Sequence, residues 1–216
     1  LEQAPQLAGK ELEASPQDLA YAAGRFTVKG TDVGIDLFEL AGRQPEQRIF
    51  MDHTSTVAGP SWPNACHISE VEIDPATGVV QVVRYSSVND IGRVVNPMIV
   101  RGQLDGGAVQ GIGQALCEHM VYDRESGQPV TGSLMDYAAP RADIVACEFV
   151  TEMNETVPSK NNPLGVKGVG ELGTIGATPS VVNAVADARA PAAKKEAAAG
   201  LQMPLTPAKV WEIVGP

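Results

Sequence analysis

The chain has 216 residues and a formal net charge of −10 at pH 7. This length can bury the core of one large domain or two small ones, and no apolar run approaches the ~20 residues that a membrane span requires. The 16 Lys and Arg residues are scattered along the sequence, whereas nucleic-acid-binding proteins cluster them. We therefore expect neither a membrane span nor a nucleic-acid partner.

The N-terminal portion has mixed helical and strand patterns. In chain order, the patterns predict a helical segment within residues 1–20 that is interrupted at Ser15-Pro16, a strand at 25–28, a helix at 35–43 and a strand at 48–54. A proline-rich loop at 59–63 then ends this portion. We expect a small α+β portion at residues 1–60 and a larger domain at 61–216.

A β-hairpin and a long helix open the larger domain. Two β-patterned runs, 66–74 and 79–88, are joined by a Pro- and Gly-containing turn, which is typical of an antiparallel hairpin. Asn96 followed by Pro97 provides a helix N-cap and a favourable first helical residue, and the helix is expected to run to about His119.

The interior of that helix is rich in glycine, which costs roughly 0.5–1 kcal/mol per residue relative to alanine. This composition suggests a need for close backbone approach. One face is expected to be polar and consists of Gln103, Gly107, Gln110 and Gln114. The opposite face is expected to pack on the core and consists of Ile99, Gly102, Gly106, Val109, Gly113 and Leu116. The glutamines could bind a polar ligand, but a solvated face with glycines that serve helix packing is favoured by these residues alone.

The most informative segment is the glycine-rich stretch at 165–173, which contains Glu171 and follows a strand predicted at 146–153. A partly buried carboxylate on such a loop would have its pKa raised, as a general base requires. An ordinary turn with a solvated glutamate is about equally plausible. Residues 168–173 also match the dinucleotide-binding pattern G-x-G-x-x-G, but no buried strand precedes them directly, and the next helix is expected only at Thr178-Pro179.

Two further features complete the pattern. The helix after Pro179 should end at Pro191, and Thr206-Pro207 should cap a last helix at 208–213. Asp90 and Arg93 are expected to form a local turn pair. The fold class is therefore α+β, with an antiparallel hairpin-based sheet packed against the glycine-rich helix and further helices.

Cysteine and histidine usage limits the metal chemistry of this chain. The three cysteines are widely spaced, without a C-x-x-C pair: Cys66, Cys117 and Cys147. The three histidines lie in separate elements: His53, His67 and His119. We expect a reducing, cytoplasmic location and no protein-only metal site or iron–sulfur cluster on this chain. The chain begins at a leucine without an initiating Met, so it is interpreted as a piece of a longer protein.

Together, residues 102–107, 110–115 and 167–171 resemble the large subunits of molybdenum hydroxylases, the xanthine dehydrogenase, aldehyde oxidase and carbon monoxide dehydrogenase family. The order and approximate spacing match the C-terminal molybdopterin-binding part of those subunits. The flanking segments match as well: 66–74, 89–97 and 203–207. The resemblance covers nearly the whole chain from about Ser15.

The resemblance implies roles for particular residues. Glu171 would be the catalytic base, Gln103 would contact the molybdopterin, and the backbone of Gly168, Val169 and Gly170 would line the cofactor. The cofactor would be molybdopterin with molybdenum, with its cytosine dinucleotide form as one option. Iron–sulfur clusters and FAD would belong to other domains or subunits.

The implied function is a component of a hydroxylase or dehydrogenase that oxidises a carbon centre with water as the oxygen source. The substrate would be a small molecule: an aldehyde, an N-heteroaromatic ring or carbon monoxide. The expected partners are the remaining large-subunit domain and the iron–sulfur and flavin modules. The alternative is a cofactor-free fragment or assembly module that shares the fold.

Overall fold

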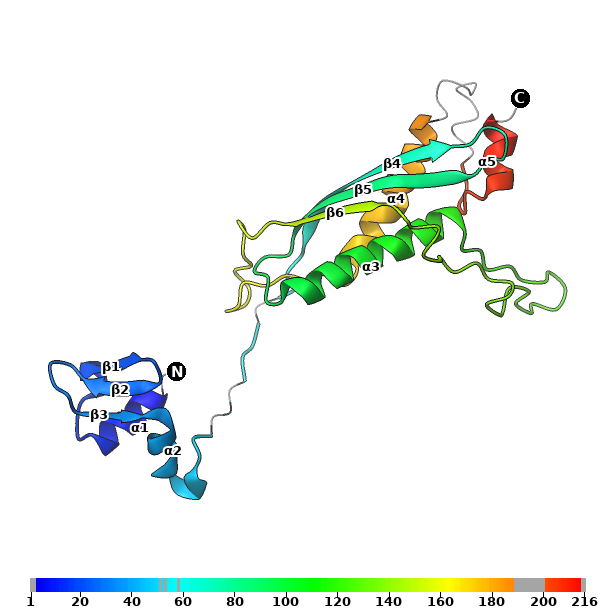
Figure 1. The fold of residues 1–216 in the computed structure, drawn as a ribbon. Coiled ribbons are helices and arrows are strands. Elements are labelled where there is room, and N and C mark those ends of the chain that lie inside the picture. The colour runs from blue at the N-terminus through cyan, green and yellow to red at the C-terminus, as the bar shows by residue number, and fades with distance from the viewer. Residues whose placement is uncertain (1–2, 51, 53, 58, 189–200, 215–216) are drawn as a thin grey trace. The chain divides into compact units, whose positions relative to one another are not determined.

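The structure, a computed structural model, describes residues 3–50, 52, 54–57, 59–188 and 201–214. Two compact units follow one another along the chain, Leu1–Thr56 and Val57–Pro216 (Figure 1). The sequence patterns place this boundary at residue 60, within the same loop region. Each unit has a hydrophobic core of its own, so the two are described separately.

The first unit is a small sheet with two helices. Its elements are α1 (Gln3–Glu11), the 3₁₀ turn η1 (Pro16–Asp18), β1 (Leu19–Ala22), β2 (Arg25–Val28), β3 (Gly34–Asp36), α2 (Leu37–Gly42) and the 3₁₀ turn η2 (Pro45–Gln47). The three strands are antiparallel in the order β1-β2-β3. The buried core consists of Ala8, Phe26, Ile35 and Leu40.

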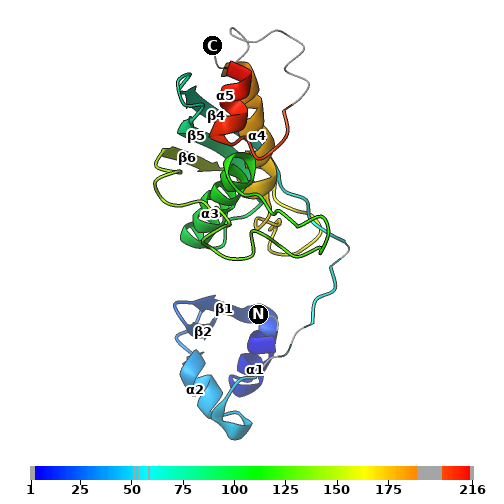
Figure 2. The ribbon, with the colours of Figure 1, turned by 90° about the vertical axis from the view of Figure 1, so that its right-hand side faces the viewer.

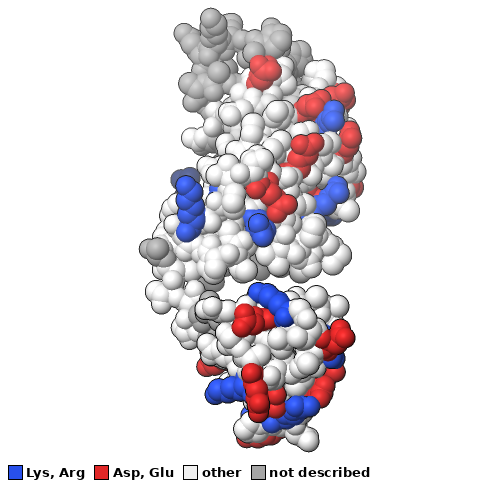
Figure 3. All heavy atoms as spheres, turned by 90° about the vertical axis from the view of Figure 1, so that its left-hand side faces the viewer, with Lys and Arg blue, Asp and Glu red and all other residues white. Residues whose placement is uncertain are grey.

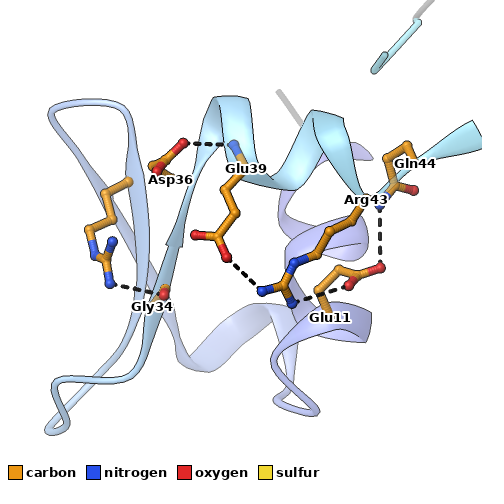
Figure 4. A network of polar contacts seen from close by, with 7 residues as sticks. Glu11, Gly34, Asp36, Glu39, Arg43 and Gln44 are labelled. Atoms are coloured by element: carbon orange, nitrogen blue, oxygen red, sulfur yellow. Dashed lines mark hydrogen bonds and ion pairs between the residues drawn. The ribbon is translucent and has the colours of Figure 1, made fainter. Parts of the chain in front are cut away.

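Polar contacts link the two helices of this unit (Figure 4). Arg43, which follows α2, makes an ion pair of 2.6 Å with Glu39 and one of 3.6 Å with Glu11 of α1. The helix predicted from residue 35 begins at Leu37 because Asp36 caps it, accepting a hydrogen bond of 2.7 Å from the backbone N–H of Glu39. The prediction of a strand at 48–54 is wrong, since the described residues of this segment form none.

The second unit is built on a three-stranded sheet of order β4-β5-β6. The predicted hairpin is confirmed: β4 (Asn64–Ile73) and β5 (Val80–Asp90) pair antiparallel. The turn is held by Asp74, which accepts hydrogen bonds from Thr77 and Ala76, and Gly78 adopts φ +71°. The third strand, β6 (Glu148–Met153), is confirmed as a strand and pairs parallel to β5, so the sheet is mixed.

Two long helices pack on one side of this sheet, as Figures 1 and 2 show. They are α3 (Pro97–Leu116), whose predicted Asn96 cap is confirmed by a 3.2 Å bond from the N–H of Ile99, and α4 (Leu172–Ala188). A short helix, α5 (Pro207–Val214), follows Thr206 as expected. The buried core consists of Val82, Tyr85, Ala108, Ile112, Ala115, Leu116, Ala177, Val181, Val185, Leu205 and Val210.

The predicted faces of α3 are right only in part. Gln103, Gln110 and Gln114 are exposed, and Gly113 and Leu116 are buried, as expected. Three members of the expected core face, Ile99, Gly102 and Gly106, are exposed, whereas Leu104, Ala108 and Ile112 are buried. Close backbone approach does occur, but at Gly107 and Gly111, which lie against α4. Helical periodicity alone could not decide between the two faces because glycine carries no side chain to mark the buried one.

The start of α4 also differs from the prediction. The helix begins at Leu172, six residues before Thr178, and contains Pro179 in its interior. Gly173 explains the early start: a Cβ there would lie 2.4 Å from the carbonyl oxygen of Leu104, so only glycine lets the first turn of α4 rest on α3. The predicted end at Pro191 and the charged segment at 194–200 lie outside the described residues.

None of the described helices is long and apolar enough to cross a membrane. On the face of the molecule shown in Figure 3, Lys and Arg side chains are interspersed with Asp and Glu. The basic side chains on that face therefore do not form the continuous patch that a nucleic-acid backbone would require.

Candidate functional site

The glycine-rich loop is anchored to the end of β5. The N–H of Lys167 donates to the carbonyl of Ile91 at 2.8 Å, and the N–H of Arg93 donates to the carbonyl of Gly165 at 2.9 Å. A Cβ on Gly92 would lie 2.2 Å from the same Gly165 oxygen, and Gly92 has φ +65°, so this close crossing requires glycine. The loop is thus held in place by backbone contacts.

An ion pair reinforces this anchor. Lys167 Nζ lies 2.6 Å from Asp90 Oδ2, and the two side chains are only 9% and 18% exposed. The hydrogen bond from Lys167 lowers the pKa of Asp90. The expected Asp90–Arg93 pair is therefore wrong: Asp90 closes its local turn through the N–H of Gly92, at 3.0 Å, and takes Lys167 as its charged partner.

Asn162 and the proline-rich loop form the next layer. Asn162 makes two hydrogen bonds with the backbone of Val166, accepting at 3.1 Å and donating at 2.9 Å. Its amide also donates to Ser61 Oγ at 3.3 Å, and Ser61 bonds Ser159 at 2.8 Å. The segment 59–63 is therefore joined to the loop that precedes Gly165, although about a hundred residues separate the two in sequence.

Glu171 lies directly before the first turn of α4. The N–H of Ile175 donates to its carbonyl at 3.0 Å, and the N–H of Leu172 donates to Val169 at 3.2 Å. The motif at 168–173 thus opens into a helix, contrary to the argument made from sequence against a dinucleotide site. A dinucleotide-binding motif should also follow a buried strand directly. This condition is not met, because β6 ends at Met153, well before Gly168.

A pocket of about 410 Å³ lies at this loop. Its walls come from the proline-rich loop and the start of α4: Ser61, Trp62, Pro63, Gly168, Val169, Gly170, Glu171, Leu172 and Ile175. Sequence reasoning did not assign Trp62 to the site, although a tryptophan between two loop prolines is a visible signal. An aromatic wall beside free polar groups is typical of a small-molecule site.

The polar groups at this loop face open space. Within the described chain, the backbone N–H groups of residues 168–171 donate to no acceptor, and a Cβ on Gly168 would meet nothing within 4 Å. The side-chain oxygen of Gln103 lies 3.8 Å from the position of a Cβ on Gly170. The structure therefore brings together Gln103, Gly168, Val169, Gly170 and Glu171, although 68 positions separate Gln103 from Glu171.

Two glutamines of the predicted polar face have other partners. The hydroxyl of Thr174 lies 3.3 Å from Gln110 Oε1, and the hydroxyl of Thr178 lies 3.0 Å from Gln114 Oε1. Both threonines belong to α4. These two glutamines lie beside α4, whereas Gln103 is the member of the face that lies near the loop.

The environment of Glu171 also differs from the expectation. Its side chain is exposed, so the residues that the structure describes do not provide the dry surroundings expected for a base of raised pKa. Nor do the described residues bring three or more His, Cys, Asp or Glu side chains together as a metal site. The arrangement suits a ligand that is bound by backbone amides and one carboxamide, as a pterin edge would be.

The family model of the molybdopterin cofactor-binding domain matches residues 1–146. The chain is 40% identical over 98% of its length to the gamma subunit of the 6-hydroxypseudooxynicotine dehydrogenase complex of Paenarthrobacter nicotinovorans, and covers 27% of that protein.

Solved structures of similar sequence are also dehydrogenases or oxidoreductases by name. Quinoline 2-oxidoreductase from Pseudomonas putida 86 matches 99% of this chain and 28% of its own, with 34% identity and a TM-score of 0.81. Reconstituted CO dehydrogenase from Oligotropha carboxidovorans matches 98% of this chain and 26% of its own, with 30% identity and a TM-score of 0.83. The chain spans about a quarter of the length of these relatives. It belongs to the molybdopterin cofactor-binding domain family, in the large subunits of the molybdenum hydroxylases.

Proposed function

We propose that this chain forms one wall of the molybdopterin site in a large subunit that oxidises a carbon centre of a small molecule, with water as the oxygen source. The observation that carries the proposal is the pocket lined by residues 168–171, whose backbone amides donate to no acceptor within the described chain. The side-chain oxygen of Gln103 lies beside it, 3.8 Å from the position of a Cβ on Gly170. The names of the relatives, which act on carbon monoxide, quinoline and 6-hydroxypseudooxynicotine, support this class of substrate.

The residues of this chain would bind and orient the cofactor. Gln103 would donate to and accept from a pterin edge, and the amides of Gly168, Val169 and Gly170 would donate to its polar atoms. When bound, the molybdenum cofactor supplies the redox chemistry and the activation of water. The cytosine dinucleotide form is the variant we propose, as the family resemblance suggests.

Glu171 would act as the general base. Its position at the first turn of α4 fixes its backbone, while its exposed side chain remains free to reach a reacting proton. In the assembled protein, the rest of the large subunit would cover the pocket and exclude water from the carboxylate.

The proposed partners are the remaining large-subunit domain and modules that carry iron–sulfur clusters and FAD, since electrons must leave the site and this chain has no cysteine motif for a cluster. The proposal of a reducing compartment rests on the wide spacing of the three cysteines in the sequence. A cytoplasmic location stays a prediction.

The test is Glu171→Gln in the assembled enzyme at matched molybdenum content. We expect turnover to fall by about 10²–10⁴-fold, because the amide cannot accept the proton, while shape and cofactor content are kept. The acidic limb of the turnover–pH profile should also disappear. Glu125→Gln, which changes a glutamate of an exposed turn, is the matched control and should leave turnover unchanged.

Two results would overturn the proposal. A near-normal rate with an unchanged acidic limb in Glu171→Gln would show that Glu171 is not the base. An assembled protein without molybdenum or pterin would instead support the alternative, a cofactor-free assembly module that shares the fold.

A further inference from the structure

A histidine that the proposed function does not use lies between the sheet and α4. His67 of β4 bonds the hydroxyl of Tyr85 on β5 through Nδ1, and the two rings meet edge-on with centroids 5.7 Å apart. Tyr85 is 1% exposed and is among the largest buried side chains. The imidazole is therefore fixed from the sheet side by a residue that cannot move without disturbing the core.

The other side of the imidazole rests on α4. A Cβ added to Gly176 would lie 2.5 Å from Cγ and Cδ2 of His67 and 2.6 Å from Nε2, distances that real side chains do not show. Gly176 is therefore the residue that lets α4 approach the ring. The thickness of the ring sets the distance between α4 and β4 at this point.

This contact lies close to the proposed base. Gly176 follows Glu171 by five positions, and Glu171, directly before α4, accepts a hydrogen bond of 3.0 Å at its carbonyl from the N–H of Ile175. The first turn of α4 is also held on α3 by Gly173 and by the Thr174 hydroxyl, which donates to the Gly107 carbonyl at 2.9 Å. The helix end that carries Glu171 is thus clamped between α3 and His67. A shift of α4 at Gly176 would be transmitted to Glu171 because a helix behaves as a rigid rod over this length.

We propose that His67 is a positioning residue for Glu171: its ring, held by Tyr85 and seated on Gly176, sets where the N-terminus of α4 presents the carboxylate. The inference rests on the proposed function of Glu171 as the base. His67 is not one of the residues that line the pocket, and in this proposal it acts through α4.

The experiment uses the parent enzyme at matched molybdenum content. The first variant, His67→Ala, removes the ring, and the second, Gly176→Ala, pushes α4 away from it. Each should lower kcat by about ten- to a hundredfold with KM little changed, since a displacement of the base by about 1 Å can cost that much. In the double variant His67→Ala/Gly176→Ala the new methyl group enters the vacated space, and we expect turnover to recover in part. Ser69→Ala, which removes the neighbouring β4–α4 contact at Ser180, is the matched control and should leave kcat unchanged.

The decisive readout is coupling to Glu171. If His67 acts through the base, His67→Ala should cause no further loss in the Glu171→Gln background. An equal loss in both backgrounds, or the same loss in Ser69→Ala, would overturn the proposal and show a general structural effect.

A second readout does not depend on turnover. Hydrogen–deuterium exchange of the amides at 172–178 should accelerate in His67→Ala and remain unchanged in Ser69→Ala. Unchanged exchange in His67→Ala would also overturn the proposal. If Glu171→Gln itself retains turnover, the proposed function fails. This failure can be told apart from a failure of the His67 contact, because the exchange data still report whether His67 holds α4. If Gly176→Ala does not fold, the His67→Ala measurements decide alone.

Discussion

The ion pair of Asp90 with Lys167 reinforces the backbone contacts that hold the glycine-rich loop at the end of β5. Its side chains come from positions 77 residues apart and are mostly buried. Removing one partner of such a pair leaves the other charge without compensation, which costs more than the pair itself contributes. The pair therefore matters for the placement of residues 168–171 as well as for stability.

We predict that Asp90→Asn lowers the free energy of unfolding by about 1–3 kcal/mol at pH 7, the usual cost of an unsatisfied buried group. The pKa of Asp90 is lowered in the folded chain, so its contribution is present above the ordinary value of 3.8 and is lost as the pH falls through the folded pKa. The stability difference between wild type and variant should therefore shrink below about pH 3.8. Urea unfolding measured from pH 7 to pH 3 checks this.

The control is Asp143→Asn, which removes an exposed ion pair with Arg141. Exposed pairs contribute little to stability, so this variant should unfold like wild type. Equal destabilisation by both substitutions, or a difference for Asp90→Asn that does not depend on pH, would contradict the assignment.

Four of the five glycines of α3 fall into two groups, and the fifth, Gly113, lies against the side chains of Glu118 and Pro140. Gly107 and Gly111 meet the backbone and small side chains of α4, whereas Gly102 and Gly106 meet nothing within 4 Å. The first group permits the helix crossing on which the start of α4 depends. No packing contact within the described chain requires glycine at the positions of the second group. These two glycines therefore only lower helix stability, as glycine does in a helix interior.

We predict opposite effects for two matched substitutions in α3. Gly102→Ala should raise the free energy of unfolding by about 0.5–1 kcal/mol, because it removes backbone entropy from the unfolded chain. Gly111→Ala should lower it by about 1–3 kcal/mol, because its methyl group would lie 2.7 Å from Cβ of Ala177 and force the helices apart. Thermal or urea unfolding of both variants measures the direction of each change in the free energy of unfolding. Destabilisation by Gly102→Ala would contradict the division of the glycines into packed and unpacked ones.

This division changes the expectation for Gly107. Its Cβ position lies 3.1 Å from Gly173 Cα and Thr174 N, so Gly107 serves helix packing and does not keep a ligand face open. A larger side chain there should impair folding first. Any loss of cofactor would follow from the shift of α4.

The whole chain presents only one wall of the proposed site. It spans about a quarter of its relatives' length, and its pocket opens beside an exposed Glu171. A large cofactor bound by one wall must be ordered without the contacts that the rest of a large subunit would add. We therefore expect binding and burial of the cofactor only in the assembled protein.

We predict that the chain purified alone contains far less than one molybdenum per chain, since contacts from one side cannot offset the entropy lost on ordering the cofactor. Elemental analysis of the isolated chain beside the assembled enzyme measures this. A stoichiometric molybdenum content in the isolated chain would show that this wall binds the cofactor by itself.

The sequence by itself determined the elements whose signals are local. The hairpin of β4 and β5 follows from alternating residues and the turn at Asp74–Gly78, and the starts of α3 and α5 follow from their Asn-Pro and Thr-Pro pairs. The family, too, was recognisable from the motifs at 102–115 and 167–171, because their glycines and glutamines occur in the order and approximate spacing of that family.

Tertiary structure decided what depends on residues far apart in sequence. Helix α4 starts at Leu172 because Gly173 fits against the Leu104 carbonyl, and no local signal marks that position. Lys167 is the partner of Asp90 because the loop at 165–167 crosses the end of β5. In each case the free energy comes from a contact between distant segments, and the pattern of residues near either partner cannot reveal it.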